Sequence, residues 1–223
     1  MMPRRKHVER PEPARRGIEL LTANQEQAWR LMHEKSIVFL TGATGTGKTY
    51  LATAFAINAI LCGHVKRLVM TRPGVTADNE DWGALPGELN EKLQPFLVPI
   101  YQTIEKIVGD NKKTKLELHA ATELAPLAFC RGRTFDNCIA ILDEAQNVTS
   151  SQLKMWLTRI GTGGKLFICG DPEQNDLGQS PLSAWVQGLS HIDRVGVVTF
   201  EESDIVRDED GLIREILQAS RTL

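Results

Sequence analysis

The chain has 223 residues, of which 42% are hydrophobic and 24% charged, with a formal net charge of −2. These values are ordinary for a globular protein and suit one well-packed domain or at most two small ones. No apolar run reaches the length of a membrane span and the N-terminus has no signal-peptide core, so we expect a cytoplasmic protein without membrane contact. The near-neutral charge gives no overall signal for nucleic acid, but it does not exclude a local basic patch.

The cysteines show no C-x-x-C spacing, and each lies in or beside an apolar segment: Cys62, Cys130, Cys138 and Cys169. We therefore interpret them as reduced core residues, not as a disulfide framework or a zinc site.

The chain begins with residues 1–17, which hold three prolines and six arginines or lysines but only two glutamates. Such a segment buries little apolar surface, so we predict a mobile basic arm, either solvated or touching nucleic acid. We expect one folded domain over 18–223. Its first helix follows Thr22, which suits an N-cap, with Gln25 at the capping-box position. The amide of Gln25 is equally suited to reading an adenine edge.

The stretch from Ile37 to Tyr50 is the strongest signal in the chain. Residues 37–40 indicate a buried strand, and the helix after the loop runs to Gly63. Between them lies a full match to G-x-x-x-x-G-K-[ST]: Gly42, Ala43, Thr44, Gly45, Thr46, Gly47, Lys48 and Thr49. In this context backbone N–H groups surround phosphate oxygens, Lys48 reaches the β- and γ-phosphates and Thr49 binds Mg²⁺. The stretch predicts a nucleoside triphosphate site.

Strands and helices alternate along the remaining chain. We predict strands over 67–71, 116–118, 125–129, 137–142, 165–169 and 194–200, and helices over 86–108, 150–160, 181–189 and 211–220. Pro95 and Pro99 should divide the first of these helices in two or kink it. The alternation predicts an α/β fold, a mainly parallel sheet with helices on both faces.

Polar residues follow several of these strands. Because ligands of parallel sheets gather at the carboxyl ends of strands, we take Asp143 as a second Mg²⁺ anchor and Glu144 as the group that activates water. The strand over 67–71 precedes Asp143 in sequence, so we expect a strand between the phosphate-loop strand and the Asp143 strand. The amides of Gln146 and Gln174 are suited to sensing the γ-phosphate, with a plain loop role as the alternative for Gln174.

The chain resembles PhoH-family ATPases, single RecA-like domains related to the N-terminal motor domain of superfamily 1 helicases, and it is similar to compact phage-encoded members. The resemblance runs from about residue 20 to the end. Its segments are GATGTGKTYLA (42–52), TRPGV (71–75), LPGELNEKLQPFLVPIY (85–101), APLAFCRGRT (125–134), ILDEAQNVT (141–149), LKMWLTRIG (153–161), GDPEQND (170–176) and DIVR (204–207). It implies that residues 18–223 form a RecA-like P-loop NTPase domain that uses ATP and Mg²⁺. No KH-type RNA-binding or PIN nuclease activity is expected.

The resemblance also implies roles for single residues. Lys48 and Thr49 serve phosphate and Mg²⁺, and Asp143 serves Mg²⁺. The remaining implied roles are a catalytic glutamate, a γ-phosphate-sensing glutamine, an adenine-reading glutamine and a γ-phosphate arginine, at Glu144, Gln174, Gln25 and Arg207 respectively. The family has histidine after that arginine, where this chain has Asp208.

A lone RecA-like domain lacks the second domain that closes over ATP in helicases, and a missing arginine costs several orders of magnitude in rate. We therefore expect a ring-like homo-oligomer, a hexamer by family resemblance, with a neighbour supplying one of four arginines: Arg207, Arg133, Arg131 and Arg159.

The leading hypothesis is an ATPase that acts on RNA or single-stranded DNA near Arg72, the loop 74–84 with Trp82, and the turn at 131–134. One alternative is a nucleotide-gated assembly protein with slow incidental hydrolysis. Another is a small-molecule kinase, which the adjacent acids and the GD-x-x-Q segment argue against.

Overall fold

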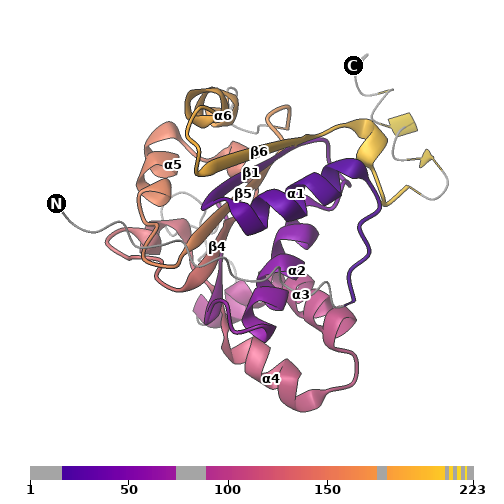
Figure 1. Ribbon diagram of the computed structural model, residues 1–223, viewed down its shortest axis with the longest axis vertical. Helices are drawn as coiled ribbons and strands as arrows, with labels where there is room; N and C mark the ends of the chain where they lie inside the picture. Colours follow the sequence, from indigo (N-terminus) through magenta and orange to yellow (C-terminus); the bar gives the residue numbers. More distant parts are fainter. Residues whose placement is uncertain are drawn as a thin grey trace.

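The computed structural model describes residues 17–73, 89–174 and 180–208, together with 211, 212, 215, 216 and 219. Within these residues six strands form one sheet in the order β3-β2-β4-β5-β1-β6, and each neighbouring pair is parallel. The strands are β1 (Ile37–Gly42), β2 (Arg67–Thr71), β3 (Thr122–Leu124), β4 (Cys138–Leu142), β5 (Lys165–Gly170) and β6 (Val195–Phe200). The predicted α/β fold with a parallel sheet is confirmed (Figure 1).

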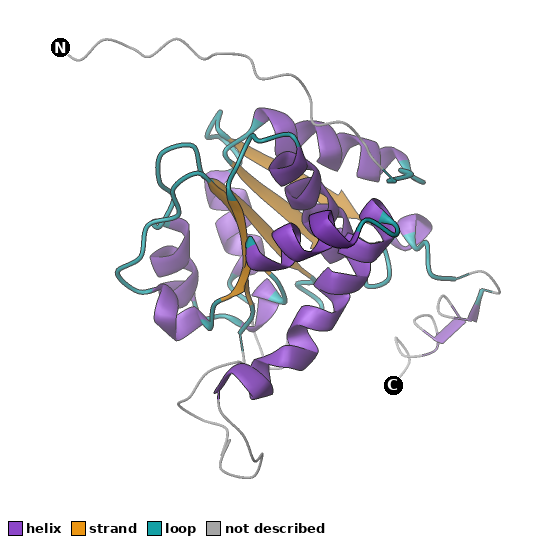
Figure 2. Ribbon diagram, turned by 90° about the horizontal axis from the view of Figure 1, so that it is seen from below, coloured by secondary structure: helices purple, strands orange, loops and turns teal. Residues whose placement is uncertain are grey.

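Helices cover both faces of this sheet (Figure 2). They are α1 (Ala23–Glu34), α2 (Lys48–Leu61), α3 (Leu89–Val108), α4 (Lys112–Ala120), α5 (Ser150–Leu157) and α6 (Leu182–Leu189), with 3-10 turns η2 (Leu127–Cys130), η3 (Ala145–Asn147) and η4 (Glu202–Asp204). Alternate strand residues belong to opposite cores: Val38 and Leu40 pack with α1 and α2, whereas Phe39 packs in the core that includes α5 and α6. Burial on both faces explains why the central strands β1, β4 and β5 are apolar along most of their length.

The order of the strands corrects one expectation. A strand does lie between β1 and β4, but it is β5 and not β2. The chain leaves β1, crosses to β2 on the far side of β4, and then returns through β4 and β5. Sequence order alone does not indicate which strand fills a gap, because a crossover helix can span several strand positions.

Two short strands predicted from the sequence are wrong. Residues 116–118 lie in α4, where Leu118 is buried and Leu116 is 71% exposed. Residues 127–129 lie in η2, and the strand β3 ends just before Ala125. Apolar patterns of three to five residues fit strand and helix equally well, so here the tertiary contacts decided.

One helix runs through both Pro95 and Pro99, so the prolines do not divide α3 in two, and the alternative of a kink stays a prediction. Both prolines are exposed, so carbonyl groups that lose an intrahelical partner can be solvated. One further expectation needs correction: Cys130, Cys138 and Cys169 are buried, but Cys62 is exposed.

Several predictions fall outside the described residues, namely the basic arm apart from Gly17, the loop 74–84 with Trp82, and most of the helix over 211–220. Across the described ranges, no helix combines the length and apolar character that a bilayer crossing requires.

Candidate functional site

The loop that joins β1 to α2 turns through three glycines with positive φ, which are 105° at Gly42, 75° at Gly45 and 83° at Gly47. At Gly42 an added Cβ would collide with the carbonyl oxygen of Phe200, the last residue of β6. That same carbonyl accepts a hydrogen bond from the N–H of Ala43 at 3.0 Å. The first glycine of the motif is therefore required by the close approach of two backbones.

Lys48 begins α2 and folds over this loop. Its Nζ donates to the carbonyl oxygens of Gly42 and Ala43, both at 2.6 Å. Burial lowers the pKa of Lys48, and nearby negative groups, with Asp171 the strongest, oppose that shift. The first turn of α2 also leaves backbone N–H groups without helical partners, which favours an anion. The loop and Lys48 together form a site suited to phosphate oxygens.

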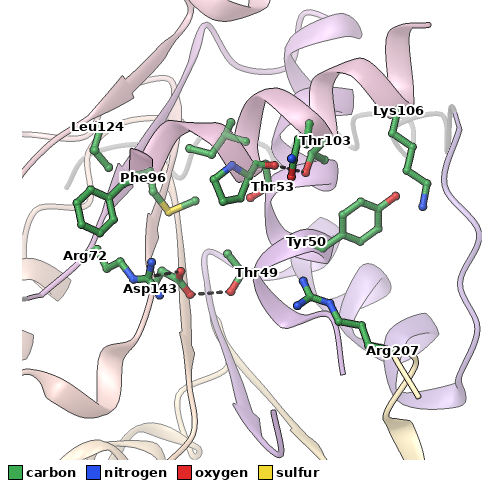
Figure 3. A pocket seen from close by; sticks show the side chains of 14 residues that line it. Thr49, Tyr50, Thr53, Arg72, Phe96, Thr103, Lys106, Leu124, Asp143 and Arg207 are labelled. Carbon is green, nitrogen blue, oxygen red and sulfur yellow. Dashed lines mark hydrogen bonds and ion pairs between the residues drawn. The ribbon is translucent and has the colours of Figure 1, made fainter. Parts of the chain in front are cut away.

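Thr49 and Asp143 meet at the centre of the site. Thr49 Oγ1 donates to Asp143 Oδ1 at 2.6 Å and joins the start of α2 to the end of β4 (Figure 3). Burial raises the pKa of Asp143, while the hydrogen bond from Thr49 and the charge of Arg72 lower it. A hydroxyl and a carboxylate are hard oxygen ligands of the kind that Mg²⁺ prefers, and phosphates and water normally complete its shell. These residues fit Mg²⁺.

Glu144 has an unusual backbone conformation, with φ 53° and ψ 40°. Its Oε1 accepts from Arg72 Nη2 at 2.7 Å and its Oε2 accepts from Gln146 Nε2 at 2.7 Å. Gln146 Oε1 in turn accepts from the backbone N–H of Asp171 at 3.0 Å. This network joins the carboxyl ends of β2, β4 and β5, and it gives Gln146 a place beside the predicted catalytic carboxylate.

The structure gives Gln25 a position against the phosphate loop. Its Nε2 donates to the carbonyl of Thr46 at 3.1 Å, and its Oε1 accepts from the N–H of Leu21 at 2.8 Å. The predicted capping box is thus only half formed: Thr22 Oγ1 accepts from the N–H of Gln25, but the Gln25 amide does not return to Thr22. Each amide atom keeps a second hydrogen-bonding position, so the adenine role stays a prediction.

Gln174 and Arg207 are less constrained. Gln174 is exposed just beyond β5, where its backbone N–H donates to the carbonyl of Asp171 at 3.0 Å. Arg207 is exposed after η4 and lines a cavity beside Thr49 (Figure 3). Their predicted roles at the γ-phosphate stay predictions.

This cavity has a volume of about 320 Å³ and lies between α2, α3 and the ends of β2, β3 and β4. Three cationic side chains and two aromatic rings are among its lining residues: Arg72, Lys106, Arg207, Tyr50 and Phe96. Lys106 Nζ lies 4.9 Å from the centre of the Tyr50 ring, and Arg72 Cζ lies 5.9 Å from that of Phe96. Sequence reasoning named Arg72 and Arg207 but missed Tyr50, Phe96 and Lys106. Of these three only Tyr50 carried a sequence signal, its position directly after Thr49, since Phe96 and Lys106 lie on a distant helix.

The other candidate arginines differ in how far their own chain engages them. Arg133 makes two hydrogen bonds to Glu123, at 2.7 and 2.9 Å. Arg159 Nε donates to the carbonyl of Met155 at 3.1 Å. Arg131 is exposed in the turn after η2. Arg131 and Arg207 are therefore the more accessible of the four.

Two known proteins are similar in sequence to most of this chain. The chain is 40% identical over 207 residues to a PhoH-like protein of Bacillus subtilis, covering 92% of this chain and 64% of that protein. It is 39% identical over 196 residues to Protein PhoH of Escherichia coli K12, covering 84% of this chain and 55% of that protein. The chain thus spans less than two thirds of the length of either relative.

Among solved structures, the large terminase of bacteriophage HK97 matches with a TM-score of 0.51 at 14% identity, covering 82% of this chain and 40% of that one. At this identity the likeness shows the fold alone, a P-loop NTPase fold of the RecA-like kind. The model of the family described as PhoH-like protein matches residues 17–220. The chain therefore belongs to the PhoH-like family of P-loop NTPases.

Proposed function

We propose that this chain binds and hydrolyses ATP with Mg²⁺, and that hydrolysis is coupled to RNA or single-stranded DNA. The observation that carries the proposal is the 2.6 Å contact between Thr49 and Asp143. It brings a phosphate-loop hydroxyl and a strand-end carboxylate to one point, as a magnesium–nucleotide site requires. Bound there, Mg²⁺ would neutralise charge on the β- and γ-phosphate oxygens.

The neighbouring residues supply the other parts of such a reaction. Lys48 exchanges its two carbonyl partners for phosphate oxygens, since it already lies in the loop. Glu144 orients the attacking water and accepts its proton. Arg207, or an arginine of a neighbouring copy, supplies the positive charge that phosphoryl transfer needs. Because a neighbouring copy could supply that arginine, a ring-like homo-oligomer, a hexamer by family resemblance, is part of this proposal.

The proposed coupling to nucleic acid rests on the cationic and aromatic lining of the cavity at the strand ends. Cations and aromatic rings together are the usual surface for a single strand. Binding through phosphates should weaken steeply as salt rises, whereas binding that salt does not change would contradict this mode.

The decisive experiment measures steady-state phosphate release by the wild type and by Glu144→Gln, each alone and with poly(U) or poly(dT). Stimulation of the wild type by one polymer, with hydrolysis lost in the variant, is the expected result. The polymer that stimulates then identifies the substrate. Phosphate release that is equal in both proteins would refute the assignment of Glu144.

A second candidate function is a nucleotide-gated assembly protein that hydrolyses ATP slowly. One observation favours it, namely that both carboxylate oxygens of Glu144 are engaged by Arg72 and Gln146. Slow hydrolysis that neither polymer stimulates, with a change of oligomeric size on adding ATP, would support this candidate instead.

A further inference from the structure

Glu144 is held from two sides in a way that the proposed hydrolysis does not need. Arg72 binds Oε1 and Gln146 binds Oε2, each at 2.7 Å. With both oxygens engaged by donors of its own chain, the carboxylate is not free to turn toward a water molecule. Its left-handed backbone is a conformation that persists only when the surroundings impose it. Arg72, Gln146 and the local backbone therefore hold the Glu144 carboxylate in one position.

Arg72 is placed to connect this carboxylate with the cavity. Thr71 pairs with Leu142, and the N–H of Asp143 donates to the carbonyl of Thr71 at 2.8 Å. Arg72 thus leaves β2 directly beside the acidic pair, with its Nε 3.8 Å from Asp143 Oδ2. The same guanidinium lines the cavity near the Phe96 ring (Figure 3). One side chain therefore contacts both acids and faces the cavity.

The cavity suits a phosphate that competes for this guanidinium. Besides Arg72 it offers Lys106, which in the described part of the chain forms no ion pair with a carboxylate. The rings of Tyr50 and Phe96 add surfaces on which a base can stack. A volume of about 320 Å³ is enough for a small polar group with part of a base. A cavity that suits both a backbone phosphate and a stacked base indicates a single-stranded nucleic acid as its ligand.

We infer that Arg72 is a positioning residue that holds Glu144 at rest until a backbone phosphate of a single strand, entering this cavity, binds its guanidinium. The inference rests on the proposed function and deepens it, because it names how strand binding reaches the hydrolytic site. Release of the Arg72 contact leaves Glu144 with Gln146 alone, free to turn toward water. No covalent step is involved.

The test compares Arg72→Met with wild type in steady-state phosphate release, alone and with poly(U) or poly(dT). We expect the variant to raise the basal rate about two- to fivefold, the range set by a half-exposed ion pair. Addition of the polymer that stimulates wild type should leave the variant rate unchanged. Arg72→Lys keeps the charge and should return the basal rate to within about twofold of wild type.

Arg67→Met is the matched control, since Arg67 begins the same strand and forms a half-exposed ion pair with Glu123 at 3.5 Å, away from the site. It should retain the wild-type basal rate and stimulation. ATP affinity and thermal midpoint, measured for every variant, show whether the fold is kept. Arg72→Gln provides a second neutral side chain if Met disturbs it.

The outcomes separate the two proposals. The proposed function fails if the wild type releases no phosphate, or if Glu144→Gln does not abolish the release. If wild type is active, a basal rate in Arg72→Met at or below that of wild type overturns the inference alone. Polymer stimulation that survives in the variant overturns it as well.

Discussion

Single residues of the loop between β1 and α2 have structural roles in addition to the phosphate binding proposed for them. Gly42 allows β1 and β6 to approach, Lys48 binds the loop carbonyls, and Thr46 Oγ1 donates back to Ala43 at 2.9 Å. The loop is therefore preorganised by its own hydrogen bonds and by β6. Substitutions here should change stability and binding together, unless they are chosen to separate the two.

Gly42→Ala should destabilise the protein by about 2–4 kcal/mol, because the new methyl group adds a clash with the Phe200 carbonyl to the cost of its positive φ. Gly63→Ala is the control, since Gly63 has φ 70° but nothing within 4 Å of an added Cβ. It should cost only about 1–2 kcal/mol. Urea unfolding of both variants measures the difference, and equal losses would contradict the clash.

Thr49→Val keeps the shape of the side chain but removes the oxygen that meets Asp143. We expect the gain in ATP affinity on adding Mg²⁺ to fall about tenfold or more, a typical loss when metal coordination is disturbed. Titration calorimetry with ATP, with Mg²⁺ or with EDTA, gives that gain for each protein. The ATP affinity in EDTA should be the same for both proteins. If the gain in ATP affinity on adding Mg²⁺ were unchanged in the variant, Thr49 would not be part of the metal site.

At the scale of elements, the edge strand β3 is only three residues long and depends on side-chain contacts. Glu123 within it binds Arg133 twice, at 2.7 and 2.9 Å, and lies 3.5 Å from Arg67 on β2. The hydrogen bond and charge of Arg133 lower the pKa of Glu123 below its ordinary value of 4.5, against an opposing effect of burial. This cluster ties β3 to β2 and to the turn after η2.

Glu123→Gln should therefore lower the free energy of unfolding at pH 7 by about 0.5–1 kcal/mol, since the ion pair is half-exposed and solvent weakens it. The folded-state pKa lies below the unfolded one, so the ion pair contributes fully above pH 4.5 and is lost as pH falls through the folded value. Urea unfolding from pH 7 down to pH 3 measures this. A difference between wild type and variant that stays constant with pH would contradict it.

Element type was predictable from sequence where the pattern is long. The apolar runs of β1, β4 and β5 are buried along nearly their whole length, and α5 has the full capping box of Thr149 with Gln152. The strand predicted over 116–118 was wrong because the pattern L-x-L also fits a helix that buries only Leu118. Pro95 and Pro99 were tolerated because they lie on the exposed side of α3. Short patterns and proline effects depend on neighbours that the local sequence does not contain.

At the scale of the whole molecule, the proposed ring would bring an arginine of a neighbouring copy to the site. Arg207 lines the cavity from its own chain, and Arg131 is exposed for use by another copy. Light scattering with ATP should show a closed oligomer, and phosphate release per chain should rise steeply with protein concentration. A monomer that turns over briskly with ATP bound would contradict the ring.

Arg131→Ala and Arg207→Ala distinguish the source of the arginine. If the arginine acts on a neighbouring chain, phosphate release is restored when its alanine variant is mixed with Glu144→Gln, because each inactive protein supplies what its neighbour lacks. A residue that acts in its own chain gives no activity in the mixture. We expect complementation for at least one of the two, and its absence for both would place the arginine within the same chain or on a partner.

The sequence by itself determined the fold class, and it predicted the candidate phosphate loop, Asp143 and Glu144. It could do so because these depend on local patterns: a buried strand, a glycine turn, a helix start and an acid at a strand end. Only the tertiary structure decided that β5 separates β1 from β4 and that Arg72 meets Glu144. It also decided that residues from α2, α3 and three strand ends enclose one cavity. The physical reason is that these contacts join residues far apart in the chain, and strand order and register bring them together.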